Sequence, residues 1–307
     1  MILKIGTRGS KLALAQSGWV KEQVEARHRD VEVVLVRIKT KGDKILDSPL
    51  SKVGGKGLFV KEIEDALLSH EVDLAVHSMK DVPGDLPQGL ELGIFPERED
   101  PRDAFVSEHH ATINDLPEGA TVGTSSLRRA AQLLRQRPDL HVVPLRGNVD
   151  TRIKKLQEQE LGAIILASAG MKRLGLSKMI RQAIPTDEML PAIGQGALGL
   201  ELRRDDRKVY DLVGFLNHES TALTVRAERA FLKELQGGCQ VPIAGYARLD
   251  GDALSLEGLV AELDGSRVIR DALTGTIQNP EAIGIELANR LLEAGAERIL
   301  AHVYGSS

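Results

Sequence analysis

Short apolar runs alternate with longer amphipathic segments through the first hundred residues of the chain. Valine- and isoleucine-rich runs of this kind are typical of buried strands, whereas apolar positions that recur every three to four residues are typical of helices. The pattern predicts strands at 3–6, 31–40 and 72–77 and helices at 12–27, with Ser10 as N-cap, and at 58–70. Because strand and helix alternate, we expect an α/β lobe with a largely parallel sheet.

A similar succession of strand, turn and helix recurs later in the chain. Gly6-Thr7-Arg8-Gly9-Ser10 closes the first strand and opens a helix, and Gly123-Thr124-Ser125-Ser126 does the same after the predicted strand residues 120–122. The apolar runs 72–77 and 163–167 likewise each lead into a serine and then a lysine. Two similar α/β lobes that face a cleft would explain this repetition. Coincidence is the alternative, because glycine-threonine and serine-rich turns are common.

Glycine and proline residues interrupt the pattern at two places, and the pattern changes after the second. They indicate a linker near 97–101 and, at 190–197, a second crossing between the lobes. From about residue 219 the spacing predicts a small α+β domain, with hairpin turns at Asp250-Gly251 and Asp264-Gly265. Its expected elements are a helix at 221–235, strands at 241–248, 253–263 and 266–276, and a helix at 280–294.

Residues 41–57 carry glycine, proline and lysine without apolar periodicity. A loop of this length inside a compact domain is typical of a lid or a binding segment. Lys52 and Lys56 lie in it. The alternative, which is the simplest one if the loop is considered by itself, is that these two lysines are exposed to solvent and bind no ligand.

The composition is that of a soluble globular protein. The 307 residues are 42% hydrophobic and 27% charged, and a formal net charge of −4 argues against a basic nucleic-acid-binding protein. No apolar run reaches membrane-spanning length and the first residues predict a strand, so we expect no membrane partner and a cytoplasmic location. Cys239 is the only cysteine, which excludes an intrachain disulfide, and the histidines lack metal-ligand spacing, so no metal site is expected.

Arginine side chains gather where predicted strands end or helices begin. Arginine presents a planar set of donors that matches a carboxylate, and a helix N-terminus itself favours an anion. These positions lie at the sheet edge where open α/β folds bind ligands, so together they predict a ligand with several carboxylates or phosphates. A surface salt bridge is the alternative for any single one. The arginines concerned are Arg8, Arg128, Arg129, Arg146, Arg152 and Arg173.

Asp81 is the best candidate for a catalytic carboxylate. It follows Lys80 at the end of an apolar run, where a carboxylate can stabilise a cationic intermediate and transfer a proton to a leaving amine. An aspartate that caps the turn before Pro83 is the alternative. His77, inside the same run, fits a buried or supporting role better than a catalytic one.

Cys239 stands in Gly237-Gly238-Cys239-Gln240-Val241-Pro242. The glycines before it remove side-chain bulk and the proline after it stiffens the chain, so another molecule can approach the thiol closely. A free cysteine is more often a small buried apolar residue, and reactivity needs a cationic or exposed setting. The arginine-, lysine- and serine-bearing segments elsewhere favour the reactive alternative.

Several of these segments resemble the motifs of one known family. They are Gly6-Thr7-Arg8-Gly9-Ser10, Val53-Gly54-Gly55-Lys56-Gly57-Leu58-Phe59, His77-Ser78-Met79-Lys80-Asp81-Val82-Pro83, Gly123-Thr124-Ser125-Ser126-Leu127-Arg128-Arg129, Arg146-Gly147-Asn148-Val149-Asp150-Thr151-Arg152 and Leu235-Gln236-Gly237-Gly238-Cys239-Gln240-Val241-Pro242-Ile243-Ala244. In this order and spacing the chain resembles the porphobilinogen deaminase family, whose members are also called hydroxymethylbilane synthases. The carboxy-terminal strands carry little of the resemblance.

The resemblance implies two α/β lobes like those of type II periplasmic binding proteins, with a cleft between them, and a small α+β C-terminal domain that carries the cysteine. Domain 1 would comprise residues 1–96 and 197–215, with the loop 41–57 as its lid. Domain 2 would comprise residues 102–190, and domain 3 residues 219–307. The chain is expected to act as a monomer.

The resemblance also implies an activity in tetrapyrrole (heme-type) biosynthesis. A hydroxymethylbilane synthase adds four porphobilinogen molecules head to tail to a dipyrromethane cofactor, with loss of ammonia, and water then releases linear hydroxymethylbilane. The dipyrromethane would be attached to Cys239 by a thioether. Asp81 would face the pyrrole N–H groups, stabilise the azafulvenium that forms when ammonia leaves, and assist proton transfer.

The remaining candidate residues would bind carboxylates or rings of these molecules. The cofactor would be held by Lys80, Thr124, Ser126, Arg128 and Arg129. Substrate and the growing chain would be held by Arg8, Ser10, Arg146, Arg152 and Arg173, with Phe59 stacked on a pyrrole ring and Lys52 and Lys56 closing the lid over carboxylates.

A non-catalytic anion-binding protein on the same two-lobed scaffold is the main alternative. It would use the arginines but would need neither an exposed thiol nor Asp81. A transcriptional effector-binding domain is disfavoured, because the sequence contains no evident helix-turn-helix or basic region.

Overall fold

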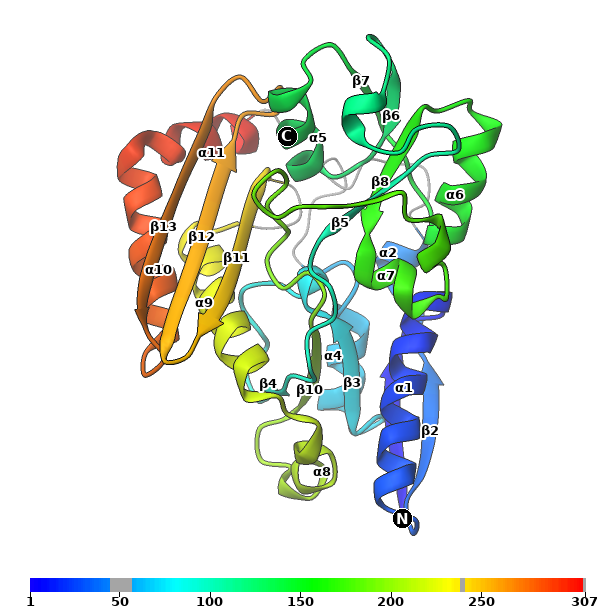
Figure 1. Cartoon of the computed structure of the whole chain (residues 1–307). Helices are drawn as coiled ribbons and strands as arrows, with labels where there is room; N and C mark the ends of the chain where they lie inside the picture. The colour runs from blue at the N-terminus through cyan, green and yellow to red at the C-terminus, as the bar shows by residue number, and fades with distance from the viewer. Residues whose placement is uncertain (45–56, 238–240, 306–307) are drawn as a thin grey trace.

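The computed structural model describes residues 1–44, 57–237 and 241–305. The strands in these residues form three sheets, two in α/β lobes and one in a smaller carboxy-terminal domain. In Figure 1 the first lobe lies at the bottom, the second at the upper right and the smaller domain at the left. The predicted fold class, α/β lobes with a small α+β domain, is confirmed. Within the described ranges, no helix is both long and apolar enough to cross a membrane.

The sheet of the first lobe has the order β2-β1-β3-β10-β4. β1 is parallel to β2 and β3, but β10 is antiparallel to both β3 and β4. The prediction of a largely parallel sheet is confirmed, because β1, β2, β3 and β4 all run in the same direction. Only β10, which enters this sheet on its return from the other lobe, runs against them. The strands are β1 (Ile2–Thr7), β2 (Glu32–Arg37), β3 (Leu74–Ser78), β4 (Leu90–Ile94) and β10 (Leu198–Arg203). The helices are α1 (Lys11–Arg27), α2 (Lys41–Lys44), α4 (Lys61–Leu68) and α8 (Arg207–Val213), with 3-10 turns η1 (Met79–Asp81) and η4 (Gly214–Leu216).

The predicted helices and strands of this lobe are present, mostly with shorter ends. α1 begins after Ser10, whose Oγ accepts a hydrogen bond from the Ala13 N–H at 3.2 Å, as an N-cap does. The expected loop 41–57 begins instead with helix α2. Residues 45–56, which include Lys52 and Lys56, lie outside the described residues.

The sheet of the second lobe has the order β7-β6-β8-β5-β9 and repeats the plan of the first. β6 is parallel to β7 and β8, and β5 is antiparallel to β8 and β9, so β5 corresponds to β10 of the first lobe. The internal similarity predicted from the sequence is thus confirmed. The strands are β5 (Asp103–Val106), β6 (Thr121–Gly123), β7 (His141–Val143), β8 (Ala163–Ala167) and β9 (Gln182–Ile184). The helices are α5 (Leu127–Gln136), α6 (Val149–Glu158) and α7 (Ser168–Arg173), with 3-10 turns η2 (Ile113–Asp115) and η3 (Ser177–Met179).

The smaller domain packs helices against one antiparallel sheet of order β11-β12-β13. Phe231 is fully buried in its core, and a Cβ at Gly258 would lie 2.5 Å from the Phe231 ring, so the strand approaches the helix only because glycine stands there. The predicted final helix continues further, after Gly295 with φ 105°. The elements are α9 (Glu219–Glu234), β11 (Ile243–Asp250), β12 (Ala253–Ala261), β13 (Val268–Thr276), α10 (Pro280–Leu291), the π-helical turn η5 (Leu292–Ala296) and α11 (Glu297–Gly305).

Apolar side chains fill both faces of each lobe sheet. Along β3, Leu74 and Val76 point into the core on the α1 side, whereas Ala75 points into the core under α4. This alternation places His77 on the α4 side and Ser78 on the α1 side of the sheet. Helices cover both faces of the sheet. This explains why the sequence of the strand predicted at 72–77 is apolar on both faces.

Two chain segments cross between the lobes in contact with one another. The Glu99 N–H donates to the Gly196 carbonyl at 3.3 Å, and Gln195 Nε2 donates to the Pro101 carbonyl at 2.7 Å. Gly196 has φ 89°, and a Cβ there would lie 2.3 Å from the Glu99 carbonyl oxygen, so the close pairing requires glycine. We call residues 97–101 the first crossing and residues 190–197 the second crossing.

Candidate active site

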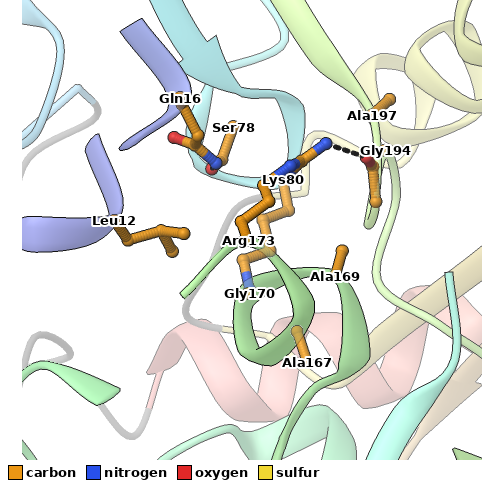
Figure 2. A pocket seen from close by; sticks show the side chains of 11 residues that line it. Leu12, Gln16, Ser78, Lys80, Ala167, Ala169, Gly170, Arg173, Gly194 and Ala197 are labelled. Carbon is orange, nitrogen blue, oxygen red and sulfur yellow. Dashed lines mark hydrogen bonds between the residues drawn. The ribbon is translucent and has the colours of Figure 1, made fainter. Parts of the chain in front are cut away.

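The ends of corresponding strands in the two lobes face each other across a small cavity beside the second crossing. Figure 2 shows Lys80 of the first lobe next to Arg173 of the second, with Gln16 and Ser78 nearby. Gln16 Nε2 donates to Ser78 Oγ at 2.8 Å. The cavity is lined by Leu12, Gln16, Ser78, Lys80, Ala167, Ala169, Gly170, Arg173, Gly194, Gly196 and Ala197. The cleft that the sequence predicts thus lies where the lobes approach.

Lys80 and Asp81 occupy the 3-10 turn that follows β3, with both side chains half-buried. Burial lowers the pKa of Lys80 to about 8, against the opposing effect of the Asp81 carboxylate, and the charges of Arg128 and Arg129 lower it further. An anion that binds beside Lys80 would therefore stabilise the charged form of its amine. The turn therefore places one carboxylate among several cations.

Arg128 and Arg129 begin α5 after Ser126, whose Oγ accepts a hydrogen bond from the Arg129 N–H. Both guanidinium groups are buried and contact Asp103, the first residue of β5. Arg128 Nη1 lies 2.6 Å from Asp103 Oδ2, and Arg129 Nε lies 2.9 Å from Asp103 Oδ1. Burial by itself would raise the pKa of Asp103, but the two guanidinium charges outweigh it and hold that pKa below its usual range. The pair is therefore fixed by a carboxylate of its own chain.

Arg152 and Arg173 are half-buried cations at the same edge of the second lobe. Burial lowers the pKa of Arg152 to about 10, and the charges of Arg129 and Arg146 act in the same direction. Burial also lowers the pKa of Arg173 to about 10. Arg152 Nε donates to the Gly147 carbonyl at 2.8 Å, and Arg173 Nη2 donates to the Gly196 carbonyl at 2.8 Å. A bound anion would stabilise cations that repel one another in this way.

The first-lobe side of the cleft holds Arg8 and Phe59. The Arg8 guanidinium carbon lies 4.3 Å from the centre of the Phe59 ring, a cation–π contact. One face of the Phe59 ring is therefore covered by Arg8 in this structure. Ser10, next along the chain, uses its Oγ as the cap of α1.

A salt bridge and a serine-threonine pair complete the described surroundings of the cleft. Lys11 Nζ of α1 lies 2.8 Å from Asp150 Oδ2 of α6, which joins the two lobes across the cleft mouth. Thr124 is buried, and its Oγ1 accepts a hydrogen bond from the Ser126 N–H at 3.2 Å. The hydroxyls of Thr124 and Ser126 are thus each oriented by a backbone N–H at the start of the helix.

Several of the predicted site residues can be grouped, in two groups within the structure and a third outside the described residues. The charges of Lys80, Asp81, Arg129 and Arg152 act on one another and form one cluster. Arg8 and Phe59 form a second, paired group. Cys239, Lys52 and Lys56 lie outside the described residues.

Sequence reasoning missed Asp103 and Gln195. Asp103 is fully buried, and Gln195 Nε2 donates to its Oδ1 at 3.0 Å. A signal for Asp103 exists in the sequence, because an acidic residue at the head of the apolar run 104–106 must find a cationic partner if that run is a buried strand. Gln195 offered no local signal.

His77 is buried and its Nε2 lies 2.8 Å from Glu201 Oε2, which confirms the expected buried role. Glu201 comes from β10, the strand that returns from the second crossing. In the part of the chain that the structure describes, no group of three or more histidine, cysteine and acidic side chains could hold a metal ion.

Family models and curated relatives match nearly the whole chain. The model described as "Porphobilinogen deaminase, dipyromethane cofactor binding domain" matches residues 3–211, and "Porphobilinogen deaminase, C-terminal domain" matches residues 222–293. The porphobilinogen deaminase of Geobacter sulfurreducens is 57% identical over 302 residues, or 98% of this chain and 95% of the relative. That of Nitratidesulfovibrio vulgaris is 58% identical over 310 residues, or 99% of this chain and 98% of the relative.

Solved structures match part of the chain more distantly. The methionine binding protein MetQ is 12% identical with a TM-score of 0.44, over 70% of this chain and 88% of that chain. A YaeC-family lipoprotein from Enterococcus faecalis is 16% identical with a TM-score of 0.42, over 72% of this chain and 93% of that chain. The family assignment stands on the sequence matches instead, which span both lobes and the smaller domain: this chain belongs to the porphobilinogen deaminase family.

Proposed function

We propose that this chain synthesises hydroxymethylbilane by adding four porphobilinogen molecules, one after another, to a covalently attached dipyrromethane. Family membership supports the reaction. The observation that carries it at the site is the cluster of Lys80, Arg129 and Arg152 around the carboxylate of Asp81. Porphobilinogen bears an acetate and a propionate, so each added ring brings carboxylates that need cationic partners.

The residues of the cleft fit a dipyrromethane with its four carboxylates. The cluster is rich in buried cations, and Arg128 Nε is buried without a hydrogen-bond partner among the described residues. We assign the carboxylates of the cofactor to Lys80, Thr124, Ser126, Arg128 and Arg129, and its thioether to Cys239. When bound, the dipyrromethane supplies the free pyrrole carbon at which the first substrate is joined.

We assign the incoming substrate and the growing chain to the arginines around this cluster. Arg146, Arg152 and Arg173 would pair with carboxylates from the second lobe, and Arg8 and Ser10 from the first. Phe59 would offer its ring to a pyrrole after Arg8 turns toward a carboxylate. Lys52 and Lys56 would approach carboxylates from the lid.

Asp81 is the proposed catalytic residue. The C–N bond of the porphobilinogen aminomethyl group breaks and ammonia leaves, so a positive charge develops on the substrate ring. The Asp81 carboxylate stabilises that charge through the pyrrole N–H. It then accepts the proton that the ring carbon of the acceptor pyrrole loses once the new C–C bond has formed.

We also propose a division of the chain that follows the sheets. Domain 1 comprises residues 1–96 and 197–215, domain 2 residues 102–190, and domain 3 residues 219–307. The return of β10 to the first sheet supports the split first domain. We further propose a cytoplasmic monomer that engages neither nucleic acid nor a membrane.

The intact mass of the purified protein tests the proposed function. We expect a mass greater than that of the polypeptide by one dipyrrole, and loss of this excess together with activity in Cys239→Ser. A wild-type protein that forms hydroxymethylbilane at full rate with an unmodified mass would disprove the covalent primer. An unmodified protein that binds carboxylates without turnover would favour the anion-binding alternative.

The same measurement separates the role of Asp81 from that of the cofactor residues. Asp81→Asn should keep the extra dipyrrole mass and lose about 10²-fold or more in kcat, because the amide cannot stabilise the cation or take the proton. A variant that turned over at the wild-type rate would remove Asp81 from the mechanism.

A further inference from the structure

Asp103 stands at the centre of a buried charge cluster with Arg128 and Arg129, and the reaction steps assigned above give it no role. Its side chain is 0% exposed, and those of Arg128 and Arg129 are 4% and 6% exposed. Arg128 contacts both carboxylate oxygens, Nη1 to Oδ2 at 2.6 Å and Nη2 to Oδ1 at 3.2 Å. Arg129 contacts Oδ1 through Nε at 2.9 Å and Nη2 at 2.7 Å. One carboxylate thus determines the orientation of both guanidinium planes.

Backbone carbonyls complete the fixation of the two arginines. Arg128 Nη1 also donates to the Leu190 carbonyl at 2.8 Å, and Arg129 Nη1 donates to the Ile165 carbonyl at 3.0 Å. Leu190 begins the second crossing, and Ile165 lies in β8. The donors that remain for a ligand are therefore few and point in defined directions, which is what precise recognition of a carboxylate requires.

Gln195 in turn orients Asp103. Its Nε2 donates to Asp103 Oδ1 at 3.0 Å and to the Pro101 carbonyl at 2.7 Å, and its Oε1 lies 3.5 Å from Arg128 Nη2 and Arg129 Nη2. Pro101 belongs to the first crossing and Gln195 to the second. The position of the arginine pair therefore depends on the register of the two crossings that join the lobes.

Charge balance indicates a role beyond stability. Two guanidinium groups share one carboxylate, so a net positive charge stays buried, and it acts on Lys80 across the cleft. A buried ion pair is weak evidence for stability, because desolvation offsets the attraction, and surplus buried charge costs more still. An anionic ligand that pairs with this surplus positive charge would explain why the protein keeps it buried.

We propose that Asp103, held by Gln195, is a positioning residue that sets Arg128 and Arg129 for the carboxylates of the dipyrromethane. The proposal rests on the proposed function. It makes Asp103 act through the arginines, with no contact to substrate, so it affects how the primer is held and leaves the binding of incoming porphobilinogen unchanged.

Asp103→Asn tests this role, with Asp139→Asn as the matched control. Asp139 pairs in the same two-pronged way with Arg137, through distances of 2.8 and 2.6 Å, at the far end of α5 and outside the cleft. In Asp103→Asn we expect a smaller dipyrrole-loaded fraction by intact mass, and in the loaded fraction a kcat about 10²-fold lower with KM within about twofold of wild type. Asp139→Asn should match wild type in loading, kcat and KM.

The outcomes separate this inference from the proposed function. If wild type itself carries no dipyrrole, the proposed function fails. If wild type is loaded and Asp103→Asn loads and turns over like it, the positioning role is wrong and the proposed function stands.

A second variant covers the case in which Asp103→Asn does not fold. Gln195→Met keeps the size of the side chain and removes its hydrogen bonds. A fall in kcat of about tenfold at unchanged KM and melting temperature supports the proposal, since the charges are untouched and only their orientation is released. Wild-type kcat in a folded Gln195→Met would overturn it.

Discussion

Glu64 lies on α4 with its side chain buried against the sheet of the first lobe, 7% exposed. Burial raises the pKa of its carboxyl from the ordinary value of 4.5 to about 7, and the charge of Glu201 adds to the rise. His77 and Lys61 oppose it, and Asp65 adds to it. The buried Oε1 of Glu201 has no hydrogen-bond partner among the described residues. The folded protein therefore holds a proton here that the unfolded chain would release.

This pKa makes stability fall as the pH rises from about 4.5 to about 7. A carboxyl whose pKa is raised by folding keeps its proton below that window and loses it, at a cost, above it. Each pKa unit is worth 1.36 kcal/mol, so the rise from 4.5 to about 7 corresponds to about 3 kcal/mol. Glu64→Gln should abolish this decline, so that the variant is the more stable protein at pH 8, by up to about 3 kcal/mol.

Urea unfolding between pH 5 and pH 8 measures the effect. Asp65→Asn is the control, because Asp65 is an exposed neighbour on the same helix and contributes less to the raised pKa of Glu64 than burial and Glu201 do, so its loss should leave most of the pH slope in place. A Glu64→Gln profile parallel to that of wild type would show that another group binds the proton.

At the scale of elements, helix starts carry both stability and binding. Ser10 caps α1 through the Ala13 N–H at 3.2 Å, and Asn279 caps α10 through the Ala282 N–H at 3.3 Å. Either side chain satisfies a backbone donor that the helix leaves unpaired. α1 begins at the cleft beside Arg8, whereas α10 lies in the smaller domain.

We expect Ser10→Ala and Asn279→Ala each to lower the free energy of unfolding by about 1 kcal/mol, because each removes one cap. Ser10→Ala alone should also raise KM for porphobilinogen, by several-fold, since it removes a hydroxyl from the substrate side of the cleft. Denaturation and steady-state kinetics on both variants check this. Equal KM changes in the two would mean that the kinetic effect follows from stability and not from binding.

At the scale of the molecule, Glu228 of α9 joins the smaller domain to both crossings. Its Oε1 lies 2.6 Å from Arg98 Nη1 and accepts from the Ala247 N–H at 2.9 Å, and its Oε2 accepts from the Gly194 N–H at 2.6 Å. The side chain is fully buried. Arg98 also lies 4.9 Å from the centre of the Tyr246 ring, a cation–π contact to β11.

Glu228→Gln should therefore destabilise the whole protein by about 3–5 kcal/mol, because it leaves the Arg98 charge buried without its partner. Glu281→Gln on the neighbouring helix removes a similar but exposed pair with Arg226 and should cost less than about 1 kcal/mol. Calorimetry distinguishes the two. We expect separate melting of the smaller domain only in Glu228→Gln, and a small equal effect in both variants would argue against a joining role.

Local pattern explains why much of the fold and of the site could be predicted. The start of α1 at Ser10, the strand 163–167 and the helix that carries Arg128 and Arg129 each depend on neighbouring residues, and all are present. The candidate cluster of Lys80, Asp81 and the arginines could also be anticipated, because the ends of such strands gather at one sheet edge. Several strands were missed, among them β5, which is only four residues long and follows a proline-rich linker.

The sequence by itself therefore determined the kinds of element, their order and the family to which the chain belongs, since these follow from spacing along the chain. Tertiary structure alone decided that β10 joins the first sheet antiparallel to β3, that His77 pairs with Glu201 across 124 positions, and that Asp103 fixes both arginines. Such pairings join residues far apart in the chain. In the compact chain, a buried charge must find a partner of opposite charge, and a strand edge must find hydrogen-bond partners. Which residues meet these needs depends on the whole fold, so no local pattern in the sequence predicts the pairings.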